Sequence, residues 1–268
     1  MMRFFDQRYN RLIYVNQSAT PDFWDDQWRI DRSVRQKIIN VKSTFVTQMT
    51  RKYLSPDDGV ILEGGCGTGI HVAALQNNGF QCIGLDYAPT TVQVLNKAVP
   101  ELDIRQGDVR CLDFEDAYFA GYWSLGVIEH FWAGYEPLGL EMARVIKSGG
   151  YLFLTFPYLS SLRKLKAKLN LYPNWTSTKA PNGFYQFALN HQSVIQNFTE
   201  WGFELVNRGK PMLGLRATKE ELGPLNPLLE RLYDYKGGSI LPRSLALTAS
   251  LVFTPISGHM ILLVLKKK

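Results

Sequence analysis

The stretch Val60-Ile61-Leu62-Glu63-Gly64-Gly65-Cys66-Gly67-Thr68-Gly69 decides the fold of this 268-residue chain. Three apolar residues lead into a glycine-rich turn, and a helical pattern begins at Ile70. Glycines at 65, 67 and 69 remove every Cβ where a ligand must approach the backbone, and the helix that follows offers unpaired N–H groups. We therefore expect a ligand-binding strand-to-helix turn, although a tight turn in any α/β protein has the same pattern.

Short apolar runs alternate with helical patterns on both sides of this turn, which predicts βαβ units. The predicted strands are residues 60–62, 82–85, 102–105, 122–127, 151–156, 203–206 and 260–265. The predicted helices between them are residues 70–77, 90–98, 137–146 and 191–201. Strands with so few polar positions are typical of a parallel sheet that is covered on both faces.

Other parts of the chain depart from this alternation. Residues 1–54 form a helical and aromatic arm: the first thirty residues are predicted to be irregular with short helices, and the apolar spacing from Ser33 to Leu54 predicts an amphipathic helix. The domain is expected over residues 55–268, with insertions at 158–190 and 209–258.

Composition excludes several classes of protein. With 46% hydrophobic and 20% charged residues, the chain is neither disordered nor a disulfide-stapled mini-protein. Its three cysteines, Cys66, Cys82 and Cys111, lack the CxxC spacing of a zinc site and fit a reducing cytosol. The N-terminal residues lack the apolar run of a secretory signal peptide. We expect a cytoplasmic protein, with a membrane-peripheral location as the alternative.

The net charge of +6 is unevenly distributed along the chain. Residues 1–150 have a net charge of −3, residues 151–268 have +9, and no acidic residue lies between Glu141 and Glu200. This pattern predicts an anionic partner or surface for the C-terminal half. Nucleic acid is not expected, because no known reader module accompanies the charge.

Two C-terminal segments raise the question of membrane contact. Residues 161–171 place leucines on one side and Arg163, Lys164, Lys166 and Lys168 largely on the other, which predicts an amphipathic basic helix. That helix is either a solvated cover of the active site or a contact with an anionic lipid, phosphate-bearing substrate or membrane. Residues 244–265 lack formal charge, but Pro255 to His259 would interrupt a spanning helix, so we predict a packed helix followed by a core strand.

Acidic residues stand at the ends of three successive predicted strands. Glu63 at the tip of the first strand would repel a pyrophosphate and favours a ligand that carries an ammonium and a sulfonium group. Asp86 follows Gly65 by 21 residues, where a carboxylate can accept both hydroxyls of a ribose. Asp108, with Val109, could recognise an adenine. Taken singly, Asp86 or Asp108 could also be a helix or turn cap.

These residues resemble the ordered motifs of class I S-adenosylmethionine (SAM)-dependent methyltransferases, especially the small-molecule group that includes ubiquinone-pathway enzymes. The resemblance covers residues 57–206 and the final strand, and its motifs are Glu63-x-Gly65-x-Gly67-x-Gly69, Gly84-Leu85-Asp86, Gly107-Asp108-Val109, Glu129-His130 and Gly149-Gly150. It implies an α/β, Rossmann-like three-layer sandwich. The sheet would have seven strands in the order 3-2-1-4-5-7-6, the last antiparallel, with helices on both faces.

The resemblance also implies roles for individual residues around SAM. Glu63 would lie near the methionine end, and Gly65, Gly67 and Gly69 would run beneath it. The other implied contacts are Asp86 with the ribose, Asp108 and Val109 with the adenine, Tyr87 beside the adenine, and Leu125 and Gly126 along the methionine and sulfonium. The implied reaction transfers a methyl group from SAM to a small-molecule or lipid-like acceptor and leaves S-adenosylhomocysteine.

The end of the fourth strand supplies the catalytic candidates. His130 is the candidate general base, because an imidazole titrates near neutral pH, and Glu129 lies beside it. Alternatively, His130 packs or caps the next segment, and Glu129 begins a helix or pairs with the arm. Some relatives have Glu-x-x-Glu-His here and bind a divalent cation, but Gly126 replaces the first Glu, so no required metal is expected.

Two other classes of function stay open at this point. An NAD-linked oxidoreductase also uses a glycine-rich turn, but Glu63 and Asp108 argue against it. A SAM-binding protein without catalytic activity, acting as a scaffold or regulator, would keep every cofactor motif named above.

Overall fold

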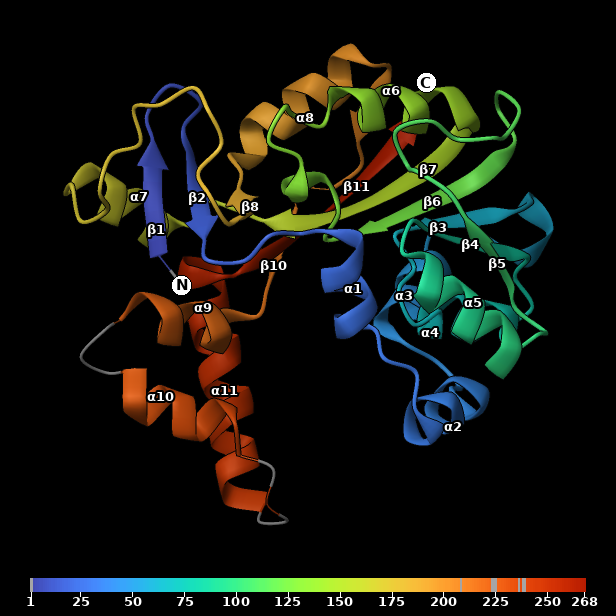
Figure 1. The fold of residues 1–268 in the computed structure, drawn as a ribbon, viewed down its shortest axis with the longest axis horizontal. Helices are drawn as coiled ribbons and strands as arrows, with labels where there is room; N and C mark the ends of the chain where they lie inside the picture. Colours follow the sequence, from blue (N-terminus) through green and yellow to red (C-terminus); the bar gives the residue numbers. More distant parts are fainter. Residues whose placement is uncertain (1, 208, 223–225, 236, 238–239) are drawn as a thin grey trace.

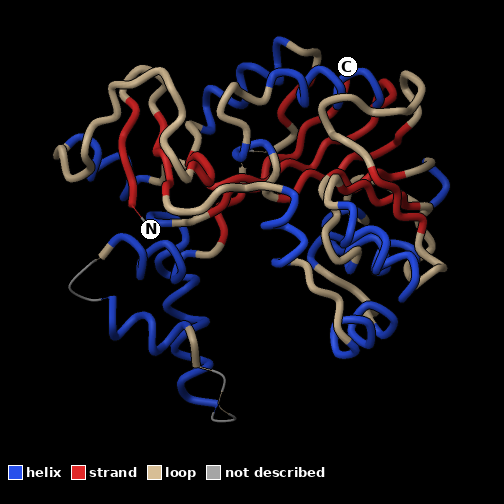
Figure 2. The backbone as a smooth tube through the Cα atoms, in the orientation of Figure 1, coloured by secondary structure: helices blue, strands red, loops and turns tan. Residues whose placement is uncertain are grey.

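A computed structural model describes residues 2–207, 209–222, 226–235, 237 and 240–268. One large sheet runs across the middle of the molecule (Figure 1 and Figure 2). Its strand order is β10-β11-β7-β6-β3-β4-β5, and β9 pairs with another part of β11. The strands are β3 Ile61–Gly64, β4 Cys82–Asp86, β5 Asp103–Gln106, β6 Phe119–Leu125, β7 Ile146–Pro157, β9 Phe203–Leu205, β10 Lys210–Met212 and β11 Met260–Lys267.

This sheet confirms the predicted Rossmann-like α/β class. The strands from β3 to β7 pair in parallel, and β11 is antiparallel to β7. The expected order 3-2-1-4-5-7-6 is present with β9 as the sixth strand, but β10 is an additional strand. The count differs because β11 is eight residues long while β9 and β10 have three residues each, so both fit along one edge of β11.

Helices cover both faces of the large sheet (Figure 1). Apolar residues of α4 and α5 share one buried core with β3 and β4, whereas those of α6 and α8 share a second core with β6 and β7. The bounds of these helices are α4 Ile70–Gln76, α5 Pro89–Ala98, α6 Glu136–Val145 and α8 His191–Glu200. Short 3-10 helices cover residues Pro56–Asp58 and Ile128–His130.

The helix predicted from Ser33 to Leu54 is two helices, α2 Arg32–Asn40 and α3 Phe45–Thr50. The two helices are separate because α3 has its own start at Thr44. The Thr44 backbone is extended, and its side chain forms a capping box with Thr47. Hydroxyl side chains that bond to nearby backbone groups favour helix ends over helix interiors.

Residues 2–15 form regular structure, which corrects the prediction of an irregular segment at the start of the arm. Strands β1 Met2–Asp6 and β2 Arg11–Val15 form an antiparallel hairpin, and β8 Phe184–Ala188 adds to β2 in a second, three-stranded sheet. Asn10 adopts a left-handed backbone conformation in the turn (φ +47°), which asparagine tolerates. The short helix expected in the arm is α1, Pro21–Gln27.

The two insertions form a lobe beside the second sheet, on the left of Figure 1. Its helices are α7 Ser161–Lys168, α9 Gly214–Glu221, α10 Asn226–Tyr233 and α11 Ile240–Ser257. As expected, α11 is followed by the core strand β11. Within the described parts of the chain, no helix combines the length and the hydropathy needed to cross a bilayer.

The orientation of α7 corrects the predicted basic outer face. Arg163 is fully buried, with its Nε 3.1 Å from Glu221 Oε1 and its Nη2 3.0 Å from His259 Nδ1. Lys166 also points to Glu221, at 2.8 Å from Oε2, whereas Leu165 is exposed. A buried carboxylate needs a cationic partner. The pairing with Glu221, rather than the leucine pattern, therefore sets the orientation of α7.

Candidate cofactor and active site

The glycine-rich turn has the backbone that its sequence requires. Gly65, Gly67 and Gly69 have φ angles of +79°, +50° and +69°, a region that other residues rarely adopt. A Cβ on Gly65 would lie 2.7 Å from Val127 Cγ2, and one on Gly67 would lie 3.0 Å from the indole of Trp28. The turn therefore needs glycine both for its conformation and for close approach.

A cavity of about 380 Å³ lies beside this turn. Eight of the predicted site residues line it: Gly65, Asp86, Tyr87, Asp108, Val109, Leu125, Gly126 and His130. The remaining four, Glu63, Gly67, Gly69 and Glu129, do not line it. The ends of β3, β4 and β6 and the turn after β5 thus bring most of the candidates to one side of the sheet.

Asp86 connects the second strand to the glycine turn. Its Oδ2 accepts a hydrogen bond from the Gly67 N–H at 2.8 Å, and its Oδ1 accepts one from the Ala88 N–H at 3.0 Å. Burial raises the pKa of Asp86, and these backbone donors oppose that rise. Each carboxylate oxygen can accept more than one hydrogen bond, so Asp86 retains the capacity to bind hydroxyl groups.

Asp108 forms a two-pronged ion pair with Arg110 in the cavity wall. The Arg110 Nη2 lies 2.6 Å from Asp108 Oδ2, and its Nε lies 3.0 Å from Oδ1. The hydrogen bond from Arg110 lowers the pKa of Asp108. Arg110 also lies over the ring of Phe131, 5.4 Å from its centroid. The sequence analysis did not single out Arg110, although its position two residues after the acid was the available signal.

The N-terminal arm closes one side of the cavity with two tryptophans. Trp24 and Trp28 stack with ring centroids 6.0 Å apart, and both line the cavity. Asp25 between them holds α1 to α5 by accepting hydrogen bonds from the Thr91 N–H and hydroxyl, at 2.7 and 2.8 Å. The Tyr87 hydroxyl donates to the Ala19 carbonyl at 3.1 Å, and burial raises the pKa of Tyr87 to about 12.

His130 is held in one tautomer by the insertion. Its Nδ1 lies 2.7 Å from the backbone oxygen of Tyr185, which can only accept, so Nδ1 carries the proton and Nε2 keeps a lone pair. Burial lowers the pKa of His130 to about 4. The imidazole is therefore neutral near pH 7 and packs edge-on against Trp24, at 5.0 Å between centroids. Nothing in the sequence pointed to Tyr185.

Glu129 is a buried acid next to this histidine. Its Oε1 lies 4.0 Å from His130 Nε2, and its Oε2 has no hydrogen-bond partner within the described residues. Burial raises the pKa of Glu129 to about 8. The described part of the chain contains no group of three His, Cys, Asp or Glu residues that could hold a metal ion, and the expectation of no required metal stays a prediction.

Glu63 lies behind the glycine turn. It is 2% exposed, and burial followed by the nearby charge of Asp86 raises its pKa well above the ordinary value. The backbone N–H of Val72 in α4 opposes this rise. Glu63 Oε2 also lacks a hydrogen-bond partner among the described residues. A cationic group bound nearby would compensate this carboxyl group.

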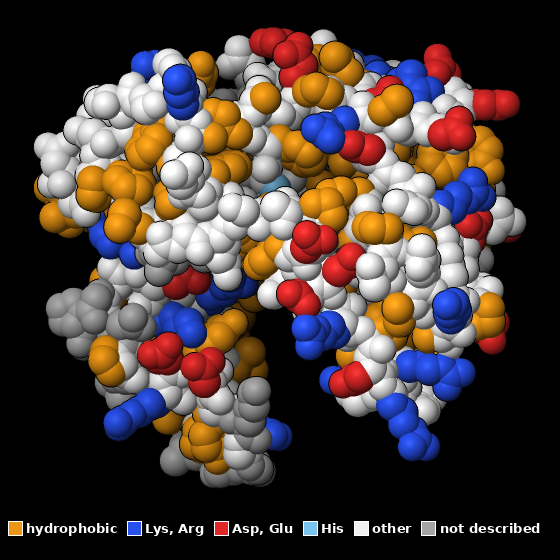
Figure 3. Space-filling view, viewed as in Figure 1, with side chains coloured by type: hydrophobic (Ala, Val, Ile, Leu, Met, Phe, Trp, Pro, Cys, Tyr) orange, Lys and Arg blue, Asp and Glu red, His pale blue; other side chains and the backbone are white. Residues whose placement is uncertain are grey.

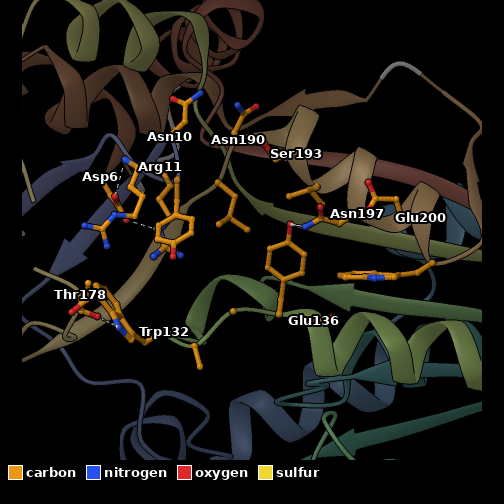
Figure 4. Close-up of a pocket in the computed structure, with 18 of the residues that line it drawn as sticks. Asp6, Asn10, Arg11, Trp132, Glu136, Thr178, Asn190, Ser193, Asn197 and Glu200 are labelled. Carbon is orange, nitrogen blue, oxygen red and sulfur yellow. Dashed lines mark hydrogen bonds and ion pairs between the residues drawn. The ribbon is translucent and has the colours of Figure 1, made fainter. Parts of the chain in front are cut away.

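A second cavity, of about 820 Å³, lies on the other side of the loop that follows His130 (Figure 4). Its wall comes from the hairpin, the segment from Trp132 to Glu136, the insertion and α8. The ten residues labelled in Figure 4 are Asp6, Asn10, Arg11, Trp132, Glu136, Thr178, Asn190, Ser193, Asn197 and Glu200. Arg11 pairs with Asp6 at 3.1 Å and lies 3.8 Å above the ring of Phe187. This cavity is larger than the one at the glycine turn, but it lacks the residues of the predicted motifs.

Comparison with known proteins agrees with the motifs found around the first cavity. Residues 62–154 match the family model described as a methyltransferase domain. The matched segment is therefore similar to S-adenosylmethionine-dependent methyltransferase domains. A Mycolicibacterium smegmatis protein named probable S-adenosylmethionine-dependent methyltransferase is 33% identical over 97 residues, which make up 36% of this chain and 37% of that protein. The match therefore spans little more than a third of that relative.

Two solved structures resemble the methyltransferase domain together with its insertions. A SAM-dependent methyltransferase from Methanosarcina mazei has a TM-score of 0.55 at 16% identity and covers 82% of this chain and 96% of its own. Geranyl diphosphate C-methyltransferase from Streptomyces coelicolor has a TM-score of 0.54 at 11% identity and covers 94% and 100%. At these identities the likeness shows the fold alone. The matched family model and the named relative agree with the predicted family and its co-substrate SAM.

Proposed function

We propose that this protein transfers a methyl group from SAM to a small-molecule or lipid-like acceptor and releases S-adenosylhomocysteine. The carrying observation is that eight predicted site residues, including Asp86, Asp108 and His130, line one cavity beside the methyltransferase glycine turn. A cavity of about 380 Å³ is within the usual size of a small-ligand site.

The residues present fit SAM. Gly65 lines the cavity and has no side chain, which suits a ligand lying against the backbone. We assign Asp86 to the ribose hydroxyls, and Asp108 and Val109 to the adenine, with Tyr87 beside it. Glu63 supports the proposal indirectly: an unpartnered buried carboxyl group near the turn would be stabilised by a ligand that carries positive charge.

His130 is the proposed general base. SAM supplies a methyl group on a positively charged sulfur that leaves as a neutral thioether. The chain aligns the acceptor atom with that methyl, excludes water and accepts a proton when the acceptor must lose one. His130 suits this role because its Nε2 lone pair is free of the bond that fixes Nδ1. Glu129 would lie beside the resulting imidazolium, with its Oε1 4.0 Å from His130 Nε2.

We propose that the segments outside the core shared with other methyltransferases determine which acceptor binds. The hairpin, the insertion, α8 and the segment from Trp132 to Glu136 together line the larger cavity, and the loop at Phe131 and Trp132 separates it from the cofactor cavity. We propose that this cavity accommodates the part of the acceptor remote from the reacting atom. The positive C-terminal half favours an anionic acceptor, and residues 161–171 remain the proposed peripheral membrane contact.

Calorimetry with SAM, S-adenosylhomocysteine and NAD tests the cofactor assignment. We expect saturable binding of SAM and S-adenosylhomocysteine with no response to NAD; binding of NAD alone would favour the oxidoreductase. Cell extract incubated with the protein and isotopically labelled SAM, followed by mass spectrometry, would identify the acceptor. Binding of S-adenosylhomocysteine without label transfer to any metabolite would favour the non-catalytic scaffold.

A further inference from the structure

The outward face of α11 is uncharged over almost its whole length. From residue 244 to 256 every exposed position is Ser, Thr, Pro or a large apolar residue. The apolar members are between 53% and 67% exposed: Leu245, Leu247, Leu251, Val252 and Ile256. Orange side chains are correspondingly visible on this part of the lobe, at the lower left of Figure 3. A helix that faces only water normally carries charged residues on its outer side.

The opposite face of α11 is fixed to the protein through α9. Gly214 begins α9 directly against the α11 backbone, where a Cβ would collide with Thr254, and its N–H donates to the Thr254 hydroxyl at 3.1 Å. One turn further along each helix, the Thr218 and Ser257 hydroxyls are 2.5 Å apart. These contacts set which face of α11 points outward, so its exposed leucines are a consequence of the packing.

The neighbouring helix α7 also has exposed leucines, and it carries lysines as well. Leu165, Leu169 and Leu171 at its C-terminal end are between 53% and 60% exposed. Lys164 and Lys168 have no acidic partner within the described residues. The helix α7 contacts α11, and both are attached to α9, in part through the Arg163–Glu221 pair.

Two of the four acidic residues of this lobe are occupied internally, whereas Glu230 and Asp234 are exposed at the surface of the α10 region. Glu220 and Glu221 point to Arg163, Lys166, His259 and Arg3 rather than to solvent. The sequence from Tyr235 to Lys268 contains no acidic residue at all. The exposed surfaces of α7 and α11, which carry no exposed acidic residue, therefore combine apolar side chains with unpaired positive charge, which is the complement of an anionic lipid surface.

We infer that α11 lies in the interface of an anionic bilayer, with its outward leucines among the lipid chains and the α7 lysines near the headgroups. The helix would lie in the membrane plane, since it is not apolar and long enough to cross. This inference concerns where the enzyme works and does not depend on the transfer reaction. A second copy of the chain could cover the same face, but unpaired cations on both copies would then repel each other.

Vesicle flotation tests the inference with the full-length protein. The vesicles are phosphatidylcholine with and without about 30% phosphatidylglycerol, at about 0.1 M and 1 M salt, where the screening length falls from about 10 Å to 3 Å. We expect binding to the anionic vesicles at low salt. Leu247→Ser with Leu251→Ser should weaken it by at least about 10-fold at low salt and further reduce any binding left at high salt.

Two further variants separate the electrostatic contribution to vesicle binding from the apolar one. Lys164→Glu with Lys168→Glu should weaken binding at low salt and have little effect at high salt, because it removes only the screened attraction. The control is Leu140→Ser on α6, where the leucine is 49% exposed and lies far from α11 in the sequence; this variant should bind vesicles normally. Unchanged circular dichroism and SAM affinity would show that the leucine and lysine variants fold.

The outcomes are distinguishable. Absence of vesicle binding by the wild type, or equal loss in the Leu140 control, overturns the inference. A dimer in sedimentation equilibrium that the leucine pair variant dissociates, without vesicle binding, identifies a second copy as the occupant instead. Vesicle binding that persists in a protein unable to bind SAM would contradict only the proposed function.

Discussion

The cofactor region and the C-terminal lobe both bury carboxyl groups, in opposite electrostatic settings. Glu129, beside the cofactor cavity, has a neutral histidine for a neighbour, and burial raises its pKa to about 8. Glu221 in the lobe is equally buried, which acts to raise its pKa, but Arg3 and Arg163 more than offset that effect and lower it. One acid can exchange a proton near neutral pH, and the other stays charged.

The difference distinguishes an acid that can take part in binding or proton transfer from one that holds segments of the chain together. A carboxylate surrounded by cations holds segments together, because removing either charge leaves the other buried without a partner. An acid without a cation costs stability in its charged form and is therefore available to a ligand or a proton. The predictions that follow alter one side of this contrast at a time.

The largest effect on stability is expected from Arg163→Met. This change leaves Glu221 and Glu220 short of a buried cation and should lower the free energy of unfolding by about 3–5 kcal/mol. Urea unfolding monitored by circular dichroism measures it. The control is Arg105→Met, which breaks an exposed pair with Asp103 and should cost less than about 1 kcal/mol. Equal losses of unfolding free energy in both variants would show that the buried pair stabilises the protein no more than the exposed pair does.

His130→Ala should reduce turnover by about 100- to 10,000-fold if a proton is lost in the transfer, the usual contribution of a general base. The affinity for SAM should change far less, since the imidazole is assigned to the acceptor side. Steady-state kinetics and calorimetry measure the two quantities separately. An unaltered turnover with the true acceptor would leave His130 with its packing role alone.

Glu129→Gln should change the pH dependence of stability. The folded-state pKa of about 8 exceeds the ordinary value of 4.5, so the folded protein holds this proton more tightly. The wild type then loses stability relative to Glu129→Gln as pH rises from 4.5 through 8. We expect a relative loss of about 2–4 kcal/mol between pH 5 and pH 8, since each pH unit of separation is worth about 1.4 kcal/mol. Urea unfolding of both proteins at these pH values tests the sign.

Asp86→Ala should weaken SAM binding by about 1–3 kcal/mol, the cost of leaving charged hydrogen-bond partners unpaired. Calorimetry is the measurement, and Asp103→Ala at the start of β5 is the control, because that carboxylate lies outside the cavity. Identical affinities for wild type and Asp86→Ala would exclude Asp86 from the cofactor site.

The same contrast explains what the sequence could predict. The glycine turn and the acids at strand ends follow from local backbone requirements and from the alternation of strands and helices, so their positions were predictable. The buried state of Arg163 was not, because its partner Glu221 lies 58 residues away in an insertion without a motif. The β1–β2 hairpin was missed for a similar reason, since its third strand, β8, comes from the other insertion.

The pairing of β2 with β8 has a consequence for biosynthesis. Leu12 pairs with Ala188, so β2 can pair with β8 only after every strand from β3 to β7 has been synthesised. The segment that carries Trp24 over the cofactor cavity follows β2 directly, and Phe23 in this segment packs against Tyr185 of β8 at 5.7 Å between ring centroids. The nascent chain can therefore assemble its central sheet before the tryptophan wall closes over the cofactor cavity.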